Sequence, residues 1–314
     1  MKFGFYLPTH GPLAKREPLL SIARHAESLG FDSMVAGDHV IAPIEPESQY
    51  PYSVGSDVPW DSSGEHLEMI AELAFLAAVT EKASLVTSVM IVPHRNPVVT
   101  AKMLSTVDVL SGGRLVVGVG VGWLEEEFEA LDAKPFRERG KVTDECLRIF
   151  KALWTEETPS FSGDYYSFEP LQFAPKPIQK PGPPIWVGGQ SRAAIRRVVR
   201  YGDAWHPVGA NPASPLEPET LVTEIEYMGS FCEKVGRNMS EITVTMKAPV
   251  YDREVTTGGG RRRFSGEPDQ IIEDVNTYAE VGVSHLILDT RSSDLNKFFE
   301  KMDWLAEEVI SKAR

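Results

Sequence analysis

Four histidines stand where predicted strands end, and histidine is the side chain that most readily exchanges a proton near neutral pH. The C-terminal ends of parallel strands meet at one face of a barrel, so these side chains are expected to converge on one rim. Asp38-His39 is the strongest pair, because the carboxylate can orient the ring beside it. We therefore predict His39 as the catalytic residue. The four strand-end residues are His10, His39, His94 and His206.

The same histidines leave a metal site as an alternative interpretation, because barrel hydrolases also gather histidines at this rim. Such a site needs closely spaced ligands, typically H-x-H on one strand or two neighbouring carboxylates, and neither spacing occurs. His25 and His66 fall on predicted helices, and His285 opens a strand at the opposite face. We assign no metal ligand and keep a metal-dependent hydrolase as the alternative from another class.

A glycine-rich run ends the fourth predicted strand. Its glycines, Gly120 and Gly122 among them, let a ligand approach the backbone closely before Trp123 and a helix follow. The dinucleotide fingerprint does not apply, because it needs glycine where Trp123 and Glu125 stand. The alternative is that these glycines only let the chain turn tightly.

An anion site is predicted at the end of the fifth strand, where Gly188, Gly189, Gln190 and Ser191 open a helix. Free backbone N–H groups and the positive end of the helix dipole suit a phosphate there, with Ser191 as the N-cap. The arginines that follow, at 192, 196, 197 and 200, are explained about as well by a solvated helix face. The basic run 261–263 after three glycines is predicted to be mobile rather than to close over an anionic tail.

These residues are positioned by a repeating alternation of short apolar runs and segments of helical periodicity, which is typical of a (β/α)8 TIM barrel. Two connections, 41–65 and 155–183, are too long for simple turns and are read as insertions in the βα loops. The second is expected to contain a small hairpin, or an ordinary surface arm, over 162–168. No linker divides the chain, so one domain spanning 1–314 is expected. The eight predicted strands are 3–8, 33–37, 84–91, 114–120, 184–188, 204–207, 242–248 and 285–289.

The composition narrows the class of partner. A formal net charge of −13 argues against nucleic acid or an anionic membrane, both of which need a broad basic surface, and favours a small-molecule substrate. The two cysteines, Cys146 and Cys232, are far apart and lack a C-x-x-C motif, which indicates reduced thiols. No signal-peptide core and no apolar window of membrane-spanning length is present, so we expect a cytoplasmic protein.

Several motifs in order along the chain resemble those of one family. The chain resembles the luciferase-like monooxygenase superfamily and, within it, the oxidoreductases that depend on the deazaflavin coenzyme F420. The motifs are Gly30-Phe31-Asp32-Ser33, Asp38-His39, Arg95-Asn96-Pro97, Ser111-Gly112-Gly113-Arg114, the glycine run from 118 to Trp123, Glu125-Glu126-Glu127-Phe128, Arg139-Gly140, Asp144-Glu145 and Pro184-Ile185-Trp186-Val187-Gly188-Gly189.

The resemblance implies a cofactor ring lying across the second to fourth strands, with its phosphate at the Gly188-Gly189 turn. Asp38 and His39 match the pair that touches the ring in deazaflavin enzymes of the family. Relatives carry a bulge with a non-prolyl cis peptide behind the ring, which corresponds here to Ser88-Val89. The cofactor-binding set is then Asp38, His39, Thr87, Ser88, Val89, Gly120, Gly122, Trp123, Gly188, Gly189, Gln190 and Ser191.

The sequence departs from the sugar-phosphate dehydrogenases of this group. Trp123 replaces their acidic residue, and Ile41-Ala42-Pro43 replaces their tryptophan after the Asp-His pair, so sugar-phosphate oxidation is not carried over. We expect hydride transfer between coenzyme F420 and a small organic substrate. The alternatives are an FMN-dependent monooxygenase of the bacterial luciferase type, supplied by a separate reductase, and a cofactor-binding protein without catalysis. The family suggests a homodimer. Trp60, Trp123 and Trp205 suggest an aromatic-lined pocket or parts of the core.

Overall fold

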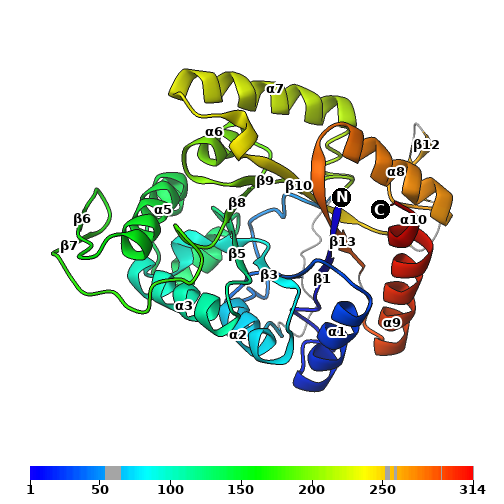
Figure 1. Ribbon diagram of the computed structural model, residues 1–314, viewed down its shortest axis with the longest axis horizontal. Coiled ribbons are helices and arrows are strands. Elements are labelled where there is room, and N and C mark those ends of the chain that lie inside the picture. Colours follow the sequence, from blue (N-terminus) through cyan, green and yellow to red (C-terminus); the bar gives the residue numbers. More distant parts are fainter. Residues whose placement is uncertain (54–64, 252–254, 258–259, 291, 314) are drawn as a thin grey trace.

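The computed structural model shows a closed barrel of parallel strands surrounded by helices (Figure 1). It describes residues 1–53, 65–251, 255–257, 260–290 and 292–313. The strand order is β3-β2-β1-β13-β10-β9-β8-β5-β4, and the β3–β5 pairing closes the ring. The barrel strands are β1 (Lys2–Tyr6), β2 (Ser33–Ala36), β3 (Ser84–Thr87), β4 (Met90–Ile91), β5 (Leu115–Gly120), β8 (Ile185–Gly188), β9 (Ala204–His206), β10 (Thr243–Pro249) and β13 (Val283–Asp289).

The predicted (β/α)8 barrel is confirmed, and each predicted strand overlaps an observed one. The third predicted strand is divided into β3 and β4 by the cis peptide Ser88-Val89, at the position that the resemblance implied. Because β3 and β4 both pair with β5, they occupy one position in the barrel. The bulge therefore lies at the C-terminal end of that strand position, beside the glycines of β5.

Helices cover the outside of the barrel (Figure 1). On α1 the apolar side chains of Leu19, Ile22, Ala23 and Ala26 are buried, as their spacing predicts. Gly30 follows with a positive φ of 79°, the conformation that ends a helix. The α-helices are α1 (Arg16–Ser28), α2 (Met69–Val79), α3 (Pro97–Leu110), α4 (Glu125–Ala130), α5 (Arg139–Thr155), α6 (Arg192–Tyr201), α7 (Pro218–Val235), α8 (Pro268–Glu280), α9 (Leu295–Trp304) and α10 (Ser311–Ala313).

Apolar side chains form two separate clusters. The larger cluster fills the space between strands and helices. The smaller one unites Val35, Val86, Val116, Trp186, Ala204 and Ile287, which come from six different barrel strands. Since successive side chains of a strand point to opposite faces, these residues fill the interior of the barrel. Trp186 is the largest of them and fills the space between the two ends.

The insertions and the basic run add short antiparallel pairs. The predicted hairpin is present as β6 (Phe161–Ser162) and β7 (Ser167–Phe168). The prediction that the run 261–263 is mobile is wrong for its two outer arginines. Arg261, on β12 (Gly260–Arg261) paired with β11 (Thr256–Thr257), and Arg263 both bind Asp274 of α8. No described helix is long and apolar enough to cross a membrane.

Candidate active site

A cavity of about 820 Å³ opens at the C-terminal ends of the barrel strands. Its size lies within the range of small-molecule and cofactor sites. Eleven of the twelve residues predicted to bind the cofactor line it. The exception is Thr87, which is fully buried and donates its hydroxyl to the carbonyl of Gly118. Thr87 therefore joins β3 to β5 beneath the cavity.

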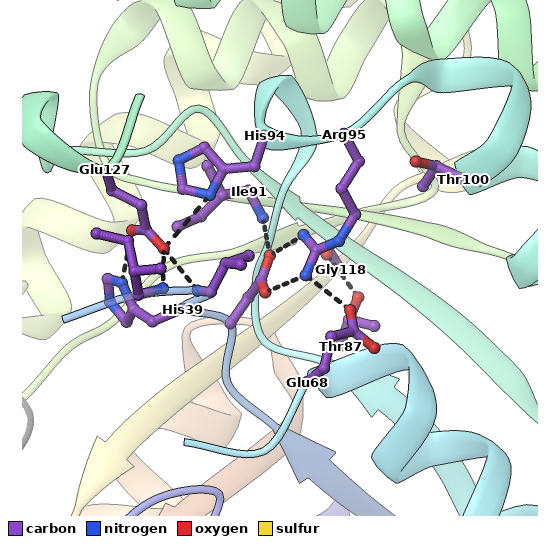
Figure 2. A network of polar contacts seen from close by, with 12 residues as sticks. His39, Glu68, Thr87, Ile91, His94, Arg95, Thr100, Gly118 and Glu127 are labelled. Atoms are coloured by element: carbon purple, nitrogen blue, oxygen red, sulfur yellow. Dashed lines mark hydrogen bonds and ion pairs between the residues drawn. The ribbon is translucent and has the colours of Figure 1, made fainter. Parts of the chain in front are cut away.

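His39 is held from behind by a buried carboxylate. Its Nδ1 lies 2.9 Å from Oε2 of Glu127, whose other oxygen accepts the backbone N–H of Val40 at 2.6 Å. Burial alone would raise the pKa of Glu127, but the hydrogen bond and charge of His39, together with His94 and the Val40 N–H, lower it overall. Glu127 is therefore ionised and accepts a hydrogen bond from the Nδ1–H of His39, which fixes the orientation of the imidazole ring (Figure 2).

Asp38 lines the cavity, but its carboxylate is tied to the protein. Oδ1 and Oδ2 accept two parallel hydrogen bonds from Arg95, at 2.8 and 2.7 Å, and Oδ2 also accepts the Ile91 N–H. Arg95 extends to Glu68 at the start of α2, as Figure 2 shows. This network links the ends of β2 and β4, so Asp38 fixes the backbone on which His39 stands.

Of the four strand-end histidines, His94 does not reach the cavity. It lies in a short 3-10 helix (Val92–His94), buried against Phe128, with Nδ1 3.7 Å from Oε1 of Glu127. Burial lowers its pKa to about 4, against the opposing charges of Glu127 and Asp38. The expectation that all four converge on the rim is therefore wrong for His94, because the chain folds back behind β4.

His206 does reach the cavity, at the end of β9. Its Nε2 lies 2.9 Å from the Ser88 hydroxyl and its Nδ1 2.6 Å from the Thr245 hydroxyl. Burial lowers the pKa of His206 to about 3, and the charges of His285 and Lys247 act in the same direction. A neutral His206 therefore fixes the serine at the cis peptide rather than carrying charge into the cavity.

The prediction that His66 lies on a helix is wrong. His66 precedes α2 and forms an antiparallel bridge with His10, and the two rings stack at a centroid distance of 5.2 Å. Both rings line the cavity, and His66 also contacts His39 edge-on at 5.8 Å. Its place could not be read from periodicity, because it depends on pairing with His10, a residue far away in the sequence.

Aromatic side chains cover the same wall. Trp123 contacts the ring of His39 at 5.9 Å and the ring of Tyr50 at 5.2 Å. Trp205 is fully buried and donates its indole N–H to the Gly189 carbonyl, which confirms the core alternative for this residue. Trp60, the third predicted tryptophan, lies outside the described residues. The tryptophan expectation therefore holds for Trp123 at the cavity.

The glycines of the cavity wall accommodate the bulge at Ser88-Val89. A Cβ at Gly120 or Gly188 would come within 3 Å of the Val89 side chain. Gly122 has a φ of 83° and would bring a Cβ against Phe128 and Ile91. These positions thus need glycine for packing and backbone conformation, and their bare backbone borders the cavity.

The predicted anion site has the expected local structure. Ser191 is the N-cap of α6, with its hydroxyl accepting the Ala194 N–H, and it lines the cavity together with Gly188, Gly189 and Gln190. The amide of Gln190 donates to the Val208 carbonyl and the Ser214 hydroxyl, which anchors the neighbouring loop.

The arginines behind this turn are directed away from the cavity. Arg192 and Arg196 contact Tyr227 of α7, Arg197 pairs with Asp144, and Arg200 lies over Phe231. A solvated helix face therefore describes the exposed Arg192 and Arg200, whereas it is wrong for Arg197, which is buried beside Asp144. Among the described residues no three histidine, cysteine, aspartate or glutamate side chains are grouped as a metal site.

The barrel, its mouth cavity and the carboxylate-held histidine define an enzyme-like (β/α)8 barrel with a ligand site at the strand ends. Residues 1–257 match the family model described as luciferase-like monooxygenase. The chain belongs to this family of F420- or FMN-dependent oxidoreductases and monooxygenases. The expected family resemblance is thereby confirmed.

Relatives within the family differ in the cofactor that their names state. An FMNH2-dependent dimethylsulfone monooxygenase of Pseudomonas putida is 32% identical over 185 residues, covering 57% of this chain and 50% of that protein. An F420-dependent glucose-6-phosphate dehydrogenase of Segniliparus rotundus is 26% identical over 320 residues, covering 88% of each. The structure of an F420-dependent secondary alcohol dehydrogenase with an F420-acetone adduct superposes with a TM-score of 0.77 at 20% identity, covering 100% of this chain and 99% of that one.

Proposed function

We propose that this protein transfers a hydride between coenzyme F420 and a small organic substrate. The observation that carries the proposal is His39 at the cavity wall, with Nδ1 bound to the ionised Glu127. A proton must accompany the hydride when a carbonyl becomes an alcohol, and a histidine with one nitrogen fixed is suited to supply it. When bound, the reduced deazaflavin supplies the hydride.

The residues of the cavity fit such a cofactor. The bare backbone of Gly120 and Gly122 and the bulge at Ser88-Val89 offer a flat wall, where added Cβ atoms would disturb packing. We assign the ring to this wall, beside Asp38, His39 and Trp123. The phosphate is assigned to Gly188, Gly189, Gln190 and Ser191 at the start of α6, a ten-residue helix.

The protein's part in the reaction is to bind, orient and exchange a proton. Glu127 accepts the hydrogen bond from the Nδ1–H of His39 and so fixes its ring, and we assign the proton exchange with the substrate to Nε2. Asp38 and Arg95 hold the backbone of His39 in place. Trp123 and Tyr50 cover the site and limit the access of water.

An FMN-dependent monooxygenase is the second candidate, and the dimethylsulfone monooxygenase among the relatives is the observation that favours it. In that case we expect a separate reductase to supply reduced FMN. A metal-dependent hydrolase would need a ligand set, and the described residues offer none. The proposal also includes a single domain, a cytoplasmic location and a homodimer.

Equilibrium titration separates the two cofactors. The full-length protein is titrated with oxidised coenzyme F420 and, separately, with FMN, while tryptophan fluorescence is followed. We expect a Kd of about 1 μM or tighter for F420 and much weaker binding of FMN. The reverse preference would make the protein a monooxygenase, and binding of neither would overturn the cofactor assignment.

Two tryptophan variants identify the reporter in this titration. Trp123 lines the cavity, whereas Trp304 lies at the end of α9 and does not. Trp123→Phe is expected to remove most of the fluorescence change, and Trp304→Phe to leave it intact. Equal loss in both variants would show that the signal comes from elsewhere.

A further inference from the structure

A buried ion pair lies on the side of the cavity that the proposed cofactor does not use. Lys247 of β10 and Asp289, the last residue of β13, have Nζ and Oδ2 3.2 Å apart, and their side chains are only 12% and 6% exposed. Both line the cavity. In the barrel, β13 and β1 stand between β10 and β2, so the pair is on a different wall from His39.

Tyr6 completes this part of the cavity floor. The Lys247 ammonium lies over its ring, 3.4 Å from the centroid. The hydroxyl of Tyr6 reaches across to Gly37, where an added Cβ would collide with it. The floor between β10 and β2 is thus an aromatic ring with an ammonium group above it.

The ammonium group has a donor left for a ligand. A lysine has three N–H donors, and here one direction is occupied by Asp289 and another by the face of Tyr6. Within the part of the chain that the structure describes, no other acceptor is paired with Nζ. Since Lys247 lines the cavity, its remaining N–H is available to a bound molecule.

The charge of the pair selects the kind of group that binds. Asp289 offsets the charge of Lys247, so this pair offers a donor without a net positive charge of its own. Removing a carboxylate or phosphate from water requires an uncompensated cation, whereas a carbonyl or hydroxyl oxygen requires only a donor. Keeping two charges away from water is itself costly, which is consistent with a role in binding.

We propose that Lys247, held by Asp289 and Tyr6, is a substrate-binding residue that donates a hydrogen bond to an uncharged carbonyl or hydroxyl oxygen. The inference rests on the proposed function, because it places the substrate between this floor and the cofactor wall. It defines the substrate class as neutral oxygen-bearing molecules rather than carboxylates or phosphate esters.

Ligand-observed NMR with two probes of similar shape tests this inference. Cyclohexanone and cyclohexanecarboxylate are compared by saturation transfer on the full-length protein, with and without the cofactor that binds in the titration. We expect the wild type to bind cyclohexanone about tenfold more tightly than the carboxylate. Lys247→Met should weaken cyclohexanone binding by about tenfold, the value of one hydrogen bond to a charged donor.

The sharper result is a reversal of the preference between the ketone and the carboxylate. Asp289→Asn leaves Lys247 without its counter-charge, so this variant should prefer the carboxylate over the ketone. Lys102→Met is the matched control, because Lys102 also lies over an aromatic ring, that of Phe173, but does not line the cavity and should not alter the preference. Unchanged preference in both Lys247→Met and Asp289→Asn, or binding of neither probe to the wild type, would overturn the inference.

Failure of this inference is distinguishable from failure of the proposed function. Cofactor affinity is measured on the same variants by tryptophan fluorescence, and Lys247→Met should keep it within about twofold, because the lysine is assigned to another wall. Normal cofactor binding with unaltered probe preference would reject only the role of Lys247. Absence of cofactor binding would reject the proposed function, while the probe preference of the cofactor-free protein would still decide the role of Lys247.

Discussion

Each end of the barrel holds a serine–histidine pair with the same hydroxyl-to-nitrogen distance, yet the cavities beside the two pairs differ in size. At the C-terminal end the Ser88 hydroxyl lies 2.9 Å from His206, and at the N-terminal end the Ser33 hydroxyl lies 2.9 Å from His285. Trp186 stands between them, with ring centroids 5.3 Å from His206 and 5.2 Å from His285. The barrel interior therefore places one serine–histidine pair on each side of Trp186, with the imidazole rings at interplanar angles of 47° for His206 and 79° for His285.

The surroundings of the pairs differ. The cavity at the N-terminal end measures about 240 Å³. Two charged side chains in its wall form hydrogen bonds with backbone groups. Arg114 donates to the carbonyls of Ala77, Thr80, Ala83 and Ser111, and Asp32 accepts the Phe3 N–H. The cavity at the C-terminal end is more than three times larger and presents His39 and Lys247 to a ligand. The loops around each serine–histidine pair, rather than the pair itself, therefore determine whether it borders a ligand-sized cavity.

The largest expected difference between the two ends is in turnover. His39→Gln should lower kcat by about 10²–10⁴-fold, the usual range for loss of a general acid or base. His285→Gln at the other end should leave kcat unchanged once the protein is folded. The measurement is steady-state oxidation of the reduced cofactor by an acceptor found in a panel of ketones and quinones. A comparable loss of kcat in both variants would contradict the division of roles between the two ends.

A smaller loss is expected when the support of His39 is altered. Glu127→Gln keeps an acceptor for the Val40 N–H but places an amide beside Nδ1, which disfavours the tautomer that exchanges a proton through Nε2. We expect kcat to fall by about 10²-fold with little change in KM. The matched control is Glu126→Gln, because Glu126 accepts the N–H groups of Glu47 and Ser48 and does not line the cavity. Equal effects of both variants would assign Glu127 a purely structural role.

Acid should act on both ends alike. Burial lowers the pKa of His206 to about 3 and that of His285 to about 4, both below the ordinary 6.5. As the pH falls below 6.5, the unfolded chain binds protons that the folded chain does not, so the free energy of unfolding decreases until the pH reaches those folded values. Each histidine should account for about 2 kcal/mol lost between pH 7.5 and pH 5.

Denaturant unfolding at several pH values measures this loss. His206→Gln and His285→Gln should each reduce the pH dependence by that amount, because glutamine does not titrate in this range. A full slope retained in one variant would mean that water reaches the histidine at that end in the folded protein.

The smallest expected effects come from the serines. Ser33→Ala and Ser88→Ala each remove one hydroxyl from a 2.9 Å pair, and each should lower the free energy of unfolding by about 1 kcal/mol. Only Ser88→Ala should also change the Kd for the cofactor, since Ser88 alone lines the larger cavity. A change in cofactor Kd for Ser33→Ala would contradict the division between the ends.

The fold and one wall of the site could be predicted because both depend on local patterns. Short apolar runs and helical periodicity alternate along the chain, and strand polarity then assigns each strand-end residue to a face, as it did for His39, His206 and His285. The glycine run ending at Gly122 and the turn at Gly188 to Ser191 carry their conformational requirements in the sequence itself.

The partners of these residues were decided by the tertiary structure. Glu127 stands 88 residues after His39, and Asp289 stands 42 residues after Lys247, so neither pairing has a spacing that a pattern could show. His66 reaches the rim through its bridge with His10, a contact between distant segments, and His94 leaves it because a 3-10 helix follows β4. The sequence alone placed His10, His39 and His206 near the mouth of the barrel, since period and strand direction are local properties. Only closure of the barrel decided which side chains touch, because contacts between distant segments depend on packing in three dimensions.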